Sequence, residues 1–199
     1  MMKNVIDSYI STLQAVLDRL PRAKIEQTIE LLHQARMENK QVFIMGNGGS
    51  ASTASHFACD LGKNTVITGR PRFRVLALTD NMALFSAYAN DDGYDSVFQE
   101  QLASMVNPQD VVIGISTSGN SANVLNAIAF ANRIGATTVG FTGFDGGKLS
   151  QLVEIEIRVS SNCIEQVEDV HLMLEHLIVT ALRERMREQA TNLRRNTLL

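Results

Sequence analysis

Five short runs of strand-forming residues that alternate with helical stretches constrain the fold of this chain more than any other feature. They span residues 42–45, 75–78, 111–115, 137–141 and 155–159. Several of them are continuously apolar, as strands are when helices cover both faces of a sheet. Alternation of strands with helices is typical of a parallel sheet in the α/β class. We therefore expect an α/β fold with a five-stranded parallel sheet flanked by helices.

Apolar residues at helical spacing predict the helices around these strands. Residues 4–38 contain two such stretches, on either side of Pro21, and both precede every expected strand. Further helices are expected at 51–61, 82–89, 97–105, 124–134 and 164–186. The chain has 199 residues, three prolines and no Pro-rich or Ser-rich linker. We therefore expect one domain, residues 1–199, with residues 1–39 as a helical extension within it.

Charge and hydropathy disfavour two classes of partner. The net charge is −3 and the pI is near 5.8, whereas nucleic-acid-binding surfaces need clustered Lys and Arg. No run approaches the ~18 apolar residues of a membrane span, and the N-terminal stretch lacks the apolar core of a signal peptide. The two cysteines, Cys59 and Cys163, make no disulfide framework. We expect a cytoplasmic protein that binds neither nucleic acid nor membrane.

A glycine-rich turn follows the first expected strand. Glycine allows positive φ angles and a close approach of the backbone to a ligand. The free N–H groups at the start of the next helix favour a phosphate. Many strand-to-helix turns contain glycine for geometry alone, so both interpretations stay open for this turn, which consists of Asn47, Gly48, Gly49 and Ser50.

Hydroxyl groups gather in the loop after the third expected strand. Residues 116–121 read Ser-Thr-Ser-Gly-Asn-Ser. One hydroxyl would suffice to cap the next helix, so the set favours a phosphate site made by Ser116, Thr117, Ser118 and Ser121. The spacing matches neither of the two common nucleotide-binding glycine motifs, and a phosphate ester other than a nucleotide fits better. Both loops could point into one crevice, because ligands of parallel sheets bind at the carboxyl ends of the strands.

Histidines and carboxylates share helix faces in two places. His56 and Asp60 are four residues apart, so their side chains point the same way. The last long helix carries Glu168, His171, Glu175 and His176. Two histidines with an Asp and a Glu would make an acceptable zinc set. From spacing alone, His56 and Asp60 could be a metal-ligand pair, an acid/base pair or a plain surface contact. His33, in the N-terminal helical region, is interpreted as a surface or packing residue.

The order and spacing of several motifs identify a resemblance to bacterial phosphoheptose isomerases that covers nearly the whole chain. The motif Ser-Thr-Ser-Gly-Asn-Ser in this setting is the most specific of them. The matching segments are residues 46–51, 56–58, 89–91, 115–123, 142–143 with 145–147, and 171–176.

The resemblance implies a SIS (sugar isomerase) domain of the flavodoxin-like kind and a homotetramer with active sites between subunits. It implies an enzyme that interconverts sedoheptulose 7-phosphate and a glycero-manno-heptose 7-phosphate. It also implies Zn²⁺ ligands at His56, Asp60, Glu168 and His176, with Asp60 as general base and His176 as its partner acid/base. Substrate contacts are implied at Asn47, Gly48, Gly49, Ser50, Asp60, Asn90, Asp91, Ser116, Thr117, Ser118, Ser121 and Glu168.

Two positions depart from the family pattern, which usually has Glu at position 60 and Gln at position 168. Asp60 is one methylene shorter, and about 1 Å of misplacement can cost ~10²-fold in rate. Glu168 adds a negative charge, which strengthens cation binding but raises the pKa of a neighbouring carboxylate. The two changes either compensate each other or mark a different sugar substrate.

The resulting hypothesis is an aldose–ketose isomerase in which one base moves a proton between C1 and C2 of an open-chain sugar through an enediol. Two alternatives stay open. One is a non-catalytic SIS-domain adaptor that binds the bacterial replication initiator protein. The other is a different sugar-phosphate activity on the same fold, such as a related isomerase or an etherase.

Overall fold

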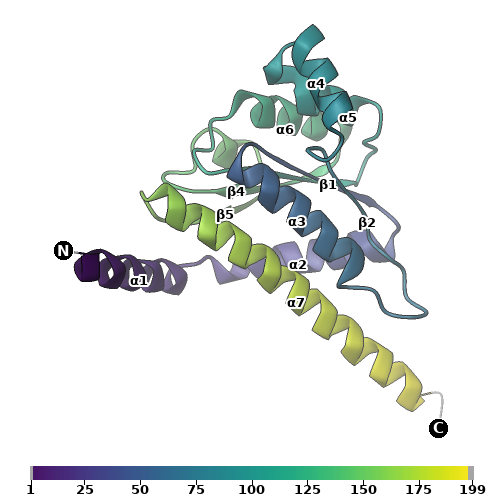
Figure 1. Ribbon diagram of the computed structural model, residues 1–199. Coiled ribbons are helices and arrows are strands. Elements are labelled where there is room, and N and C mark those ends of the chain that lie inside the picture. The colour runs from purple at the N-terminus through teal and green to yellow at the C-terminus, as the bar shows by residue number, and fades with distance from the viewer. Residues whose placement is uncertain (1, 197–199) are drawn as a thin grey trace.

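The computed structural model describes residues 2–196 and the side chains of residues 4–188. Its five strands form one parallel sheet in the order β2-β1-β3-β4-β5 (Figure 1). This confirms the predicted fold class, and each strand lies within one residue of its predicted run. The strands are β1 (Gln41–Gly46), β2 (Arg74–Ala77), β3 (Val111–Ser116), β4 (Thr137–Thr142) and β5 (Ile155–Arg158).

Seven α-helices are described, and each coincides with a predicted helical stretch. The last one runs ten residues further than the sequence pattern predicts, to Asn196. Two short 3-10 helices, η1 (Tyr94–Ser96) and η2 (Leu149–Gln151), lie between the longer elements. The α-helices are α1 (Met2–Asp18), α2 (Arg22–Met37), α3 (Gly49–Lys63), α4 (Met82–Asp91), α5 (Val97–Ala103), α6 (Ala122–Ile134) and α7 (Ile164–Asn196).

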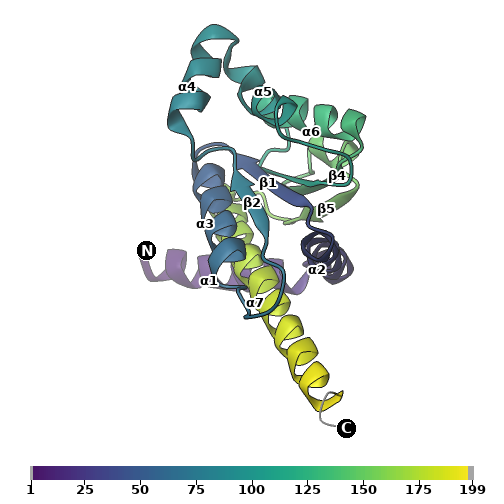
Figure 2. The same cartoon turned by 90° about the vertical axis from the view of Figure 1, so that its right-hand side faces the viewer.

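Helices cover both faces of the sheet, because successive strand residues point to opposite sides. In β1, Val42 and Ile44 join the core shared with α2, α3 and α7. Phe43 and Met45 join the core shared with α5 and α6 on the other face. Figures 1 and 2 show these two helical layers, with α4 projecting beyond the second one.

The order of the strands places two loops side by side. The chain runs from β1 outward to the edge strand β2, and then returns past β1 to β3. Residue Gly46 at the end of β1 therefore pairs with Ile115 near the end of β3. The loops that leave these two strands open at the carboxyl edge of the sheet, at the reversal point where ligands of such folds bind.

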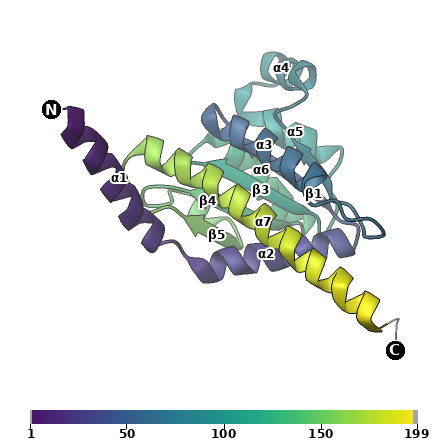
Figure 3. The ribbon, with the colours of Figure 1, turned by 60° about the horizontal axis from the view of Figure 1, so that its bottom comes forward.

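Helix α7 lies along α3 on one face of the sheet, as Figures 1 and 3 show. The N-terminal helix α1 is attached near the start of α7, where the Tyr9 hydroxyl donates to Asp169 Oδ2 at 2.5 Å and Gln166 Nε2 donates to Thr12 Oγ1 at 2.6 Å. None of the helices in the described part of the chain has the length and apolarity that a membrane span requires.

We predict that Phe57→Ala lowers the free energy of unfolding by about 3–5 kcal/mol. Phe57 is fully buried on α3, and its ring centroid lies 6.2 Å from that of Phe141 in β4. Urea denaturation measures the change. Val66→Ala, at a position that is 39% exposed, is the control and should cost less than about 1 kcal/mol; similar losses in both variants would contradict this packing.

Candidate active site

The loop between β1 and α3 requires glycine for two separate reasons. Gly48 has a φ angle of +56°, which residues with a Cβ rarely adopt. A Cβ on Gly46 would lie 2.7 Å from Ser50 Cβ and 2.9 Å from the Ile115 carbonyl oxygen. Gly48 also gives α3 no side-chain cap, and the first N–H groups of a helix have no partner within it. The turn therefore presents backbone donors at close range.

The hydroxyls of the loop between β3 and α6 do not cap α6. Ser121 occupies the N-cap position of α6 but makes no side-chain capping bond. Its Oγ instead lies 3.1 Å from Ser116 Oγ. Gly119, with a φ angle of +63°, turns the loop and donates its N–H to the Ser116 carbonyl oxygen at 2.9 Å. This arrangement favours a site for ligand oxygens over a helix cap.

The two loops line a shared cavity of about 210 Å³. Polar groups from both loops contribute to it, as the sequence predicts. Glu168 of α7 is the one charged residue that lines it among the described residues. The lining consists of Asn47, Ser50, Ile115, Ser116, Thr117, Ser118, Ser121, Phe144, Ile164 and Glu168.

A pair of asparagines ties the two loops together, and sequence reasoning did not select one of them. Asn47 Nδ2 donates to Asn123 Oδ1 at 2.8 Å, and Asn123 Nδ2 donates to Asn47 Oδ1 at 2.9 Å. The Tyr94 hydroxyl also donates to Asn47 Oδ1, at 2.8 Å. Asn123 is 1% exposed, so it orients Asn47 from beneath. Its place two residues after the Ser-Thr-Ser-Gly-Asn-Ser motif is the signal that could have indicated it.

The loop of residues 143–148, which follows β4, supports the hydroxyl-rich loop from one side. The Gly143 N–H donates to the Thr117 carbonyl oxygen at 2.9 Å, and the Leu149 N–H donates to that of Gly119, also at 2.9 Å. These contacts connect the two segments backbone to backbone. The position of the hydroxyls therefore depends on the shape of the 143–148 loop.

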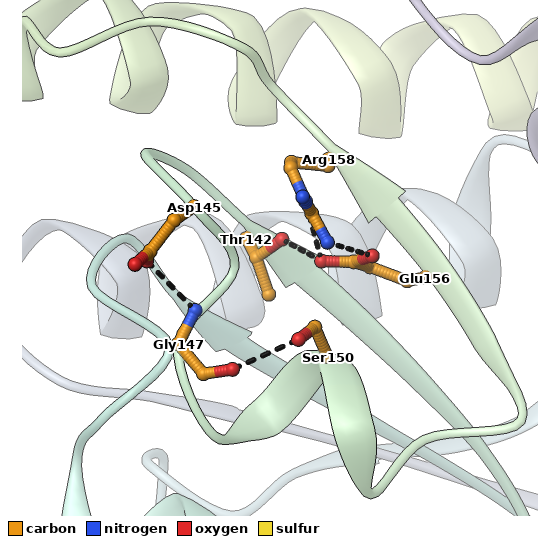
Figure 4. Close-up of polar contacts among 6 residues, drawn as sticks. All are labelled: Thr142, Asp145, Gly147, Ser150, Glu156 and Arg158. Atoms are coloured by element: carbon orange, nitrogen blue, oxygen red, sulfur yellow. Dashed lines mark hydrogen bonds and ion pairs between the residues drawn. The ribbon is translucent and has the colours of Figure 1, made fainter.

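A network of polar side chains holds this supporting loop (Figure 4). Glu156 on β5 accepts hydrogen bonds from the Thr142 hydroxyl at 2.7 Å and from Arg158 at 2.9 and 2.7 Å. The Gly147 N–H donates to Asp145 Oδ1 at 3.1 Å. Bidentate arginine–carboxylate pairs add geometric specificity. The Arg158–Glu156 pair lies within β5, and the Thr142 hydroxyl joins it to the end of β4.

A second cluster of polar groups lies where α3 packs against α7. It consists of His56, Asp60, Glu175 and His176, and one potential ligand atom from each lies within 4.8 Å of the others. His56 Nε2 is 3.8 Å from Asp60 Oδ1, and His176 Nε2 is 3.1 Å from Glu175 Oε1. The two imidazole rings meet edge to face, with centroids 4.9 Å apart. Nitrogen and carboxylate donors in this number are able to hold a divalent cation or to move protons.

Glu175 is the buried member of this cluster. Its side chain is 0% exposed, whereas those of His56 and His176 are 45% and 49% exposed. Burial, with a smaller contribution from the negative charge of Asp60, raises the pKa of Glu175 to about 8. Because a carboxylate is costly to bury, the metal-free protein keeps this group mostly protonated at neutral pH.

His171 is a core residue that stands apart from the cluster. It is 1% exposed, and its Nε2 lies 3.1 Å from the Thr142 carbonyl oxygen, so Nε2–H is the donor. Burial lowers the pKa of His171 to about 4, which keeps the imidazole neutral. Within the described part of the chain it makes no hydrogen bond to Glu175, although the two share a helix face.

Three of the predicted site residues lie apart from the groups that they were expected to join. Glu168 is outside the His/carboxylate cluster, and its carboxylate lies about 3.0 Å from where a Cβ on Gly49 would be. Asn90 and Asp91 are exposed at the end of α4, where Asn90 Nδ2 donates to Asp91 Oδ1 at 2.7 Å. They line neither the 210 Å³ cavity nor the neighbouring one, beside Gly48 and Tyr94.

A larger cavity, of about 1020 Å³, lies between α1 and the segment 160–166. None of the predicted site residues lines it, and Arg19 is the single charged side chain among its described lining residues. The histidines and carboxylates that the structure gathers lie at the α3–α7 cluster and, with Glu168, beside the two loops. We therefore place the candidate active site there.

Comparisons with known proteins show the family of the chain. The family profile of the SIS domain matches residues 8–143. The phosphoheptose isomerase of Syntrophotalea carbinolica is 35% identical, over 91% of this chain and 93% of the relative. That of Aliarcobacter butzleri is 37% identical, over 88% of each. The chain belongs to the phosphoheptose isomerase family.

Solved structures of this family share the fold over most of this chain. The structure of the phosphoheptose isomerase from Neisseria gonorrhoeae has a TM-score of 0.84 and 28% sequence identity, covering 92% of this chain and 100% of that one. The resemblance identified from the motifs is thereby confirmed, and the chain is a member of a family of sugar-phosphate isomerases.

We predict that Gly119→Ala destabilises the protein and weakens binding of inorganic phosphate. An alanine at this φ angle costs roughly 1–2 kcal/mol, and its Cβ would lie 2.0 Å from the Gly146 carbonyl oxygen, so the backbone must move. Gly69→Ala is a matched control, since its φ angle is +79° but no atom lies within 4 Å of the added Cβ. Urea denaturation and calorimetric titration should show a larger loss for Gly119→Ala; equal losses would contradict a collision there.

We predict that, without metal, the wild-type protein loses stability between pH 6.5 and 8 and that Glu175→Gln does not. The pKa of Glu175 rises from 4.5 to about 8 on folding, so in this range the folded state binds the extra proton and a higher pH favours unfolding. The slope is at most about 1.4 kcal/mol per pH unit. His171 opposes this effect only below pH 6.5, since its pKa falls on folding.

Urea denaturation in the presence of a chelator, at several pH values, measures these slopes. Glu184→Gln is the control, because the side chain of Glu184 is 54% exposed. Its slope should equal that of the wild type. Parallel slopes for the wild type and Glu175→Gln would show that Glu175 is ionised in the folded protein throughout this range.

Proposed function

We propose that this protein is an aldose–ketose isomerase that converts sedoheptulose 7-phosphate to glycero-manno-heptose 7-phosphate through an enediol. The observation that carries this proposal is the path of α3. This helix begins at the glycine-rich loop of residues 47–50 and carries His56 and Asp60 two to three turns later. From Gly49 to His56 the helix rises roughly 10 Å, on the order of the length of an extended open-chain heptose phosphate. A phosphate held at the loops places the other end of the sugar at the cluster.

Asp60 and His176 carry the proton transfers in this proposal. Asp60 removes a proton from C1 of the ketose, the electron pair of that C–H bond forms the C1–C2 double bond, and the π electrons of the C2 carbonyl move to its oxygen, which is then protonated to give the enediol. His176 passes a proton between the two oxygens, and the proton on Asp60 returns to C2 to give the aldose. Both side chains are partly exposed beside a cavity-lining helix, and acid/base groups need such access to the reacting carbons.

The phosphate-binding part of the site uses hydroxyls and backbone donors. Asn47, Gly48, Gly49 and Ser50 from one loop and Ser116, Thr117, Ser118 and Ser121 from the other would contact the substrate. Glu168 would accept hydrogen bonds from sugar hydroxyls, since a carboxylate in this cavity repels the phosphate itself. These roles are those that the family resemblance implies, assigned to residues of the two loops and to Glu168.

A divalent cation, Zn²⁺ by resemblance, belongs to this proposal. The donor set fits, because two imidazoles and at least one carboxylate converge and the buried carboxyl group beside them makes no hydrogen bond among the described residues. His56, Asp60 and His176, three of the four ligands that the resemblance implies, would hold it. The bound cation would polarise the oxygens on C1 and C2 and stabilise the enediolate.

We also propose a homotetramer with active sites between subunits, working in the cytoplasm. Two features support the assembly. Asn90 and Asp91 are implied as substrate contacts yet lie away from the cavities of their own chain, so another subunit's site would receive them. Exposed apolar residues on α1, such as Val5 and Ile6 at 65% and 59%, suit burial against another copy. The free thiols of Cys59 and Cys163 suit a reducing compartment.

The adaptor alternative finds no support in the comparisons reported above, whose relatives are named as isomerases. This chain also retains the two histidines and Asp60 at positions where they meet. Binding of sedoheptulose 7-phosphate without turnover would favour a different sugar phosphate as the substrate of the same chemistry.

We predict zinc-dependent conversion of sedoheptulose 7-phosphate to an aldoheptose phosphate by the purified protein. Asp60→Asn and His176→Ala should each lower kcat by about 10²–10⁴-fold, the usual contribution of a positioned acid or base. Asp18→Asn, an exposed change at the end of α1, is the control and should leave kcat unchanged. Absence of turnover by the wild type, with bound sugar phosphate, would refute the proposed reaction; unchanged kcat in both site variants would refute the assigned roles.

A further inference from the structure

Glu175 is a buried acidic side chain for which the described residues offer no hydrogen-bond partner. Its side chain is 0% exposed, and neither carboxylate oxygen has a hydrogen bond within the part of the chain that the structure describes. An isolated buried carboxylate costs several kcal/mol unless it is paired or coordinates a metal. Two imidazole nitrogens, His56 Nδ1 and His176 Nε2, lie next to its Oε1.

The spacing of these atoms matches that of ligands around one small cation. Four ligands at about 2.0–2.1 Å from a tetrahedral zinc ion lie roughly 3.3 Å from one another. Glu175 Oε1 lies 3.1 Å from His176 Nε2 and 3.4 Å from His56 Nδ1. Asp60 completes a set whose ligand atoms all lie within 4.8 Å of one another. The two distances from Glu175 to the histidines therefore suit one ion already, whereas the widest spacing in the set has to shorten when an ion binds.

Glu168 occupies a different environment on the same helix. Its carboxylate faces Gly49 and lines the cavity formed by the two substrate loops. It is seven residues before Glu175, which corresponds to a rise of roughly 10 Å along α7. The two acidic residues therefore serve separate places, one beside the loops and one between the histidines.

We propose that Glu175 is a direct ligand of the divalent cation, together with His56, Asp60 and His176, and that Glu168 is left free to bind substrate. This inference rests on the cation of the proposed function and assigns its fourth ligand. It also explains why an acidic residue is tolerated in the core, since the ion supplies the charge partner that the protein does not. In the competing arrangement Glu175 only accepts a hydrogen bond from a histidine and orients it.

The experiment compares metal binding by the metal-free wild type, Glu175→Gln and Glu168→Gln. Calorimetric titration with Zn²⁺ gives affinity and stoichiometry, and the visible absorption of bound Co²⁺ reports the ligand set. We expect one ion per chain for the wild type and an affinity at least 100-fold lower for Glu175→Gln, with a changed Co²⁺ spectrum. Glu168→Gln should bind within a few-fold of the wild type and give the same spectrum.

Thermal unfolding with and without Zn²⁺ checks that the variants fold. Metal-free Glu175→Gln should be about as stable as the metal-free wild type at neutral pH, because an uncharged amide replaces a carboxyl group that is mostly protonated there. Zn²⁺ should raise Tm for the wild type and Glu168→Gln, and much less for Glu175→Gln.

Three results would overturn the inference. One is wild-type protein that binds no Zn²⁺. The second is a loss of affinity in Glu168→Gln that equals or exceeds the loss in Glu175→Gln. The third is an unchanged Co²⁺ spectrum in Glu175→Gln, which indicates that Glu175 orients a histidine.

The proposed reaction is tested separately by turnover of sedoheptulose 7-phosphate. A protein that binds Zn²⁺ through Glu175 but does not convert this sugar would retain the inference and lose the proposed substrate. If the wild type converts the sugar and Glu175→Gln binds metal normally, the proposed substrate is retained and the inference about Glu175 is wrong.

Discussion

The packing of α7 along α3 is the interaction on which the candidate active site depends. Phe57 and Leu61 of α3 and Leu174 and Ile178 of α7 are fully buried in one core on the same face of the sheet. This apolar contact fixes the distance between the two helices and their rotation about their axes. The polar residues next to the contact are thereby brought face to face, although more than a hundred residues of chain separate them.

The sheet supplies the second fixed element of the site. Because β1 and β3 are neighbours and parallel, their carboxyl ends present two loops at one edge. The reciprocal hydrogen bonds between Asn47 and Asn123 then hold those loops in register. Since α3 starts at the first of these loops and carries His56 and Asp60, one helix connects the loops with the histidine cluster.

Stability and function make opposite demands at Glu175. An apolar side chain of similar volume would fill the position between the helices without a desolvation cost. A carboxylate there is favourable only if a cation or a proton accompanies it. Departures from the rule that interiors are apolar tend to mark functional sites, and in this chain the departure lies between two histidines.

Much of the fold follows from local patterns in the sequence. Short runs of strand-forming residues, several of them continuously apolar, predicted all five strands, and helical periodicity predicted the helices. Both patterns depend on neighbours along the chain. The end of α7 was predicted ten residues early, since its last turns lack a clear stop signal such as Gly or Pro. The extent of the domain, 1–199, stays a prediction from chain length and composition.

The sequence by itself also determined the two loops and the His56–Asp60 pair, because turn chemistry and helix spacing are local properties. Only the tertiary structure decided that Asn123 and Tyr94 hold Asn47, and that Glu175 joins the histidine cluster while Glu168 faces the loops. Helical periodicity tells which residues share a face, but the neighbour that each face meets depends on how helices pack on the sheet. That packing is set by the whole core, and no local pattern encodes it.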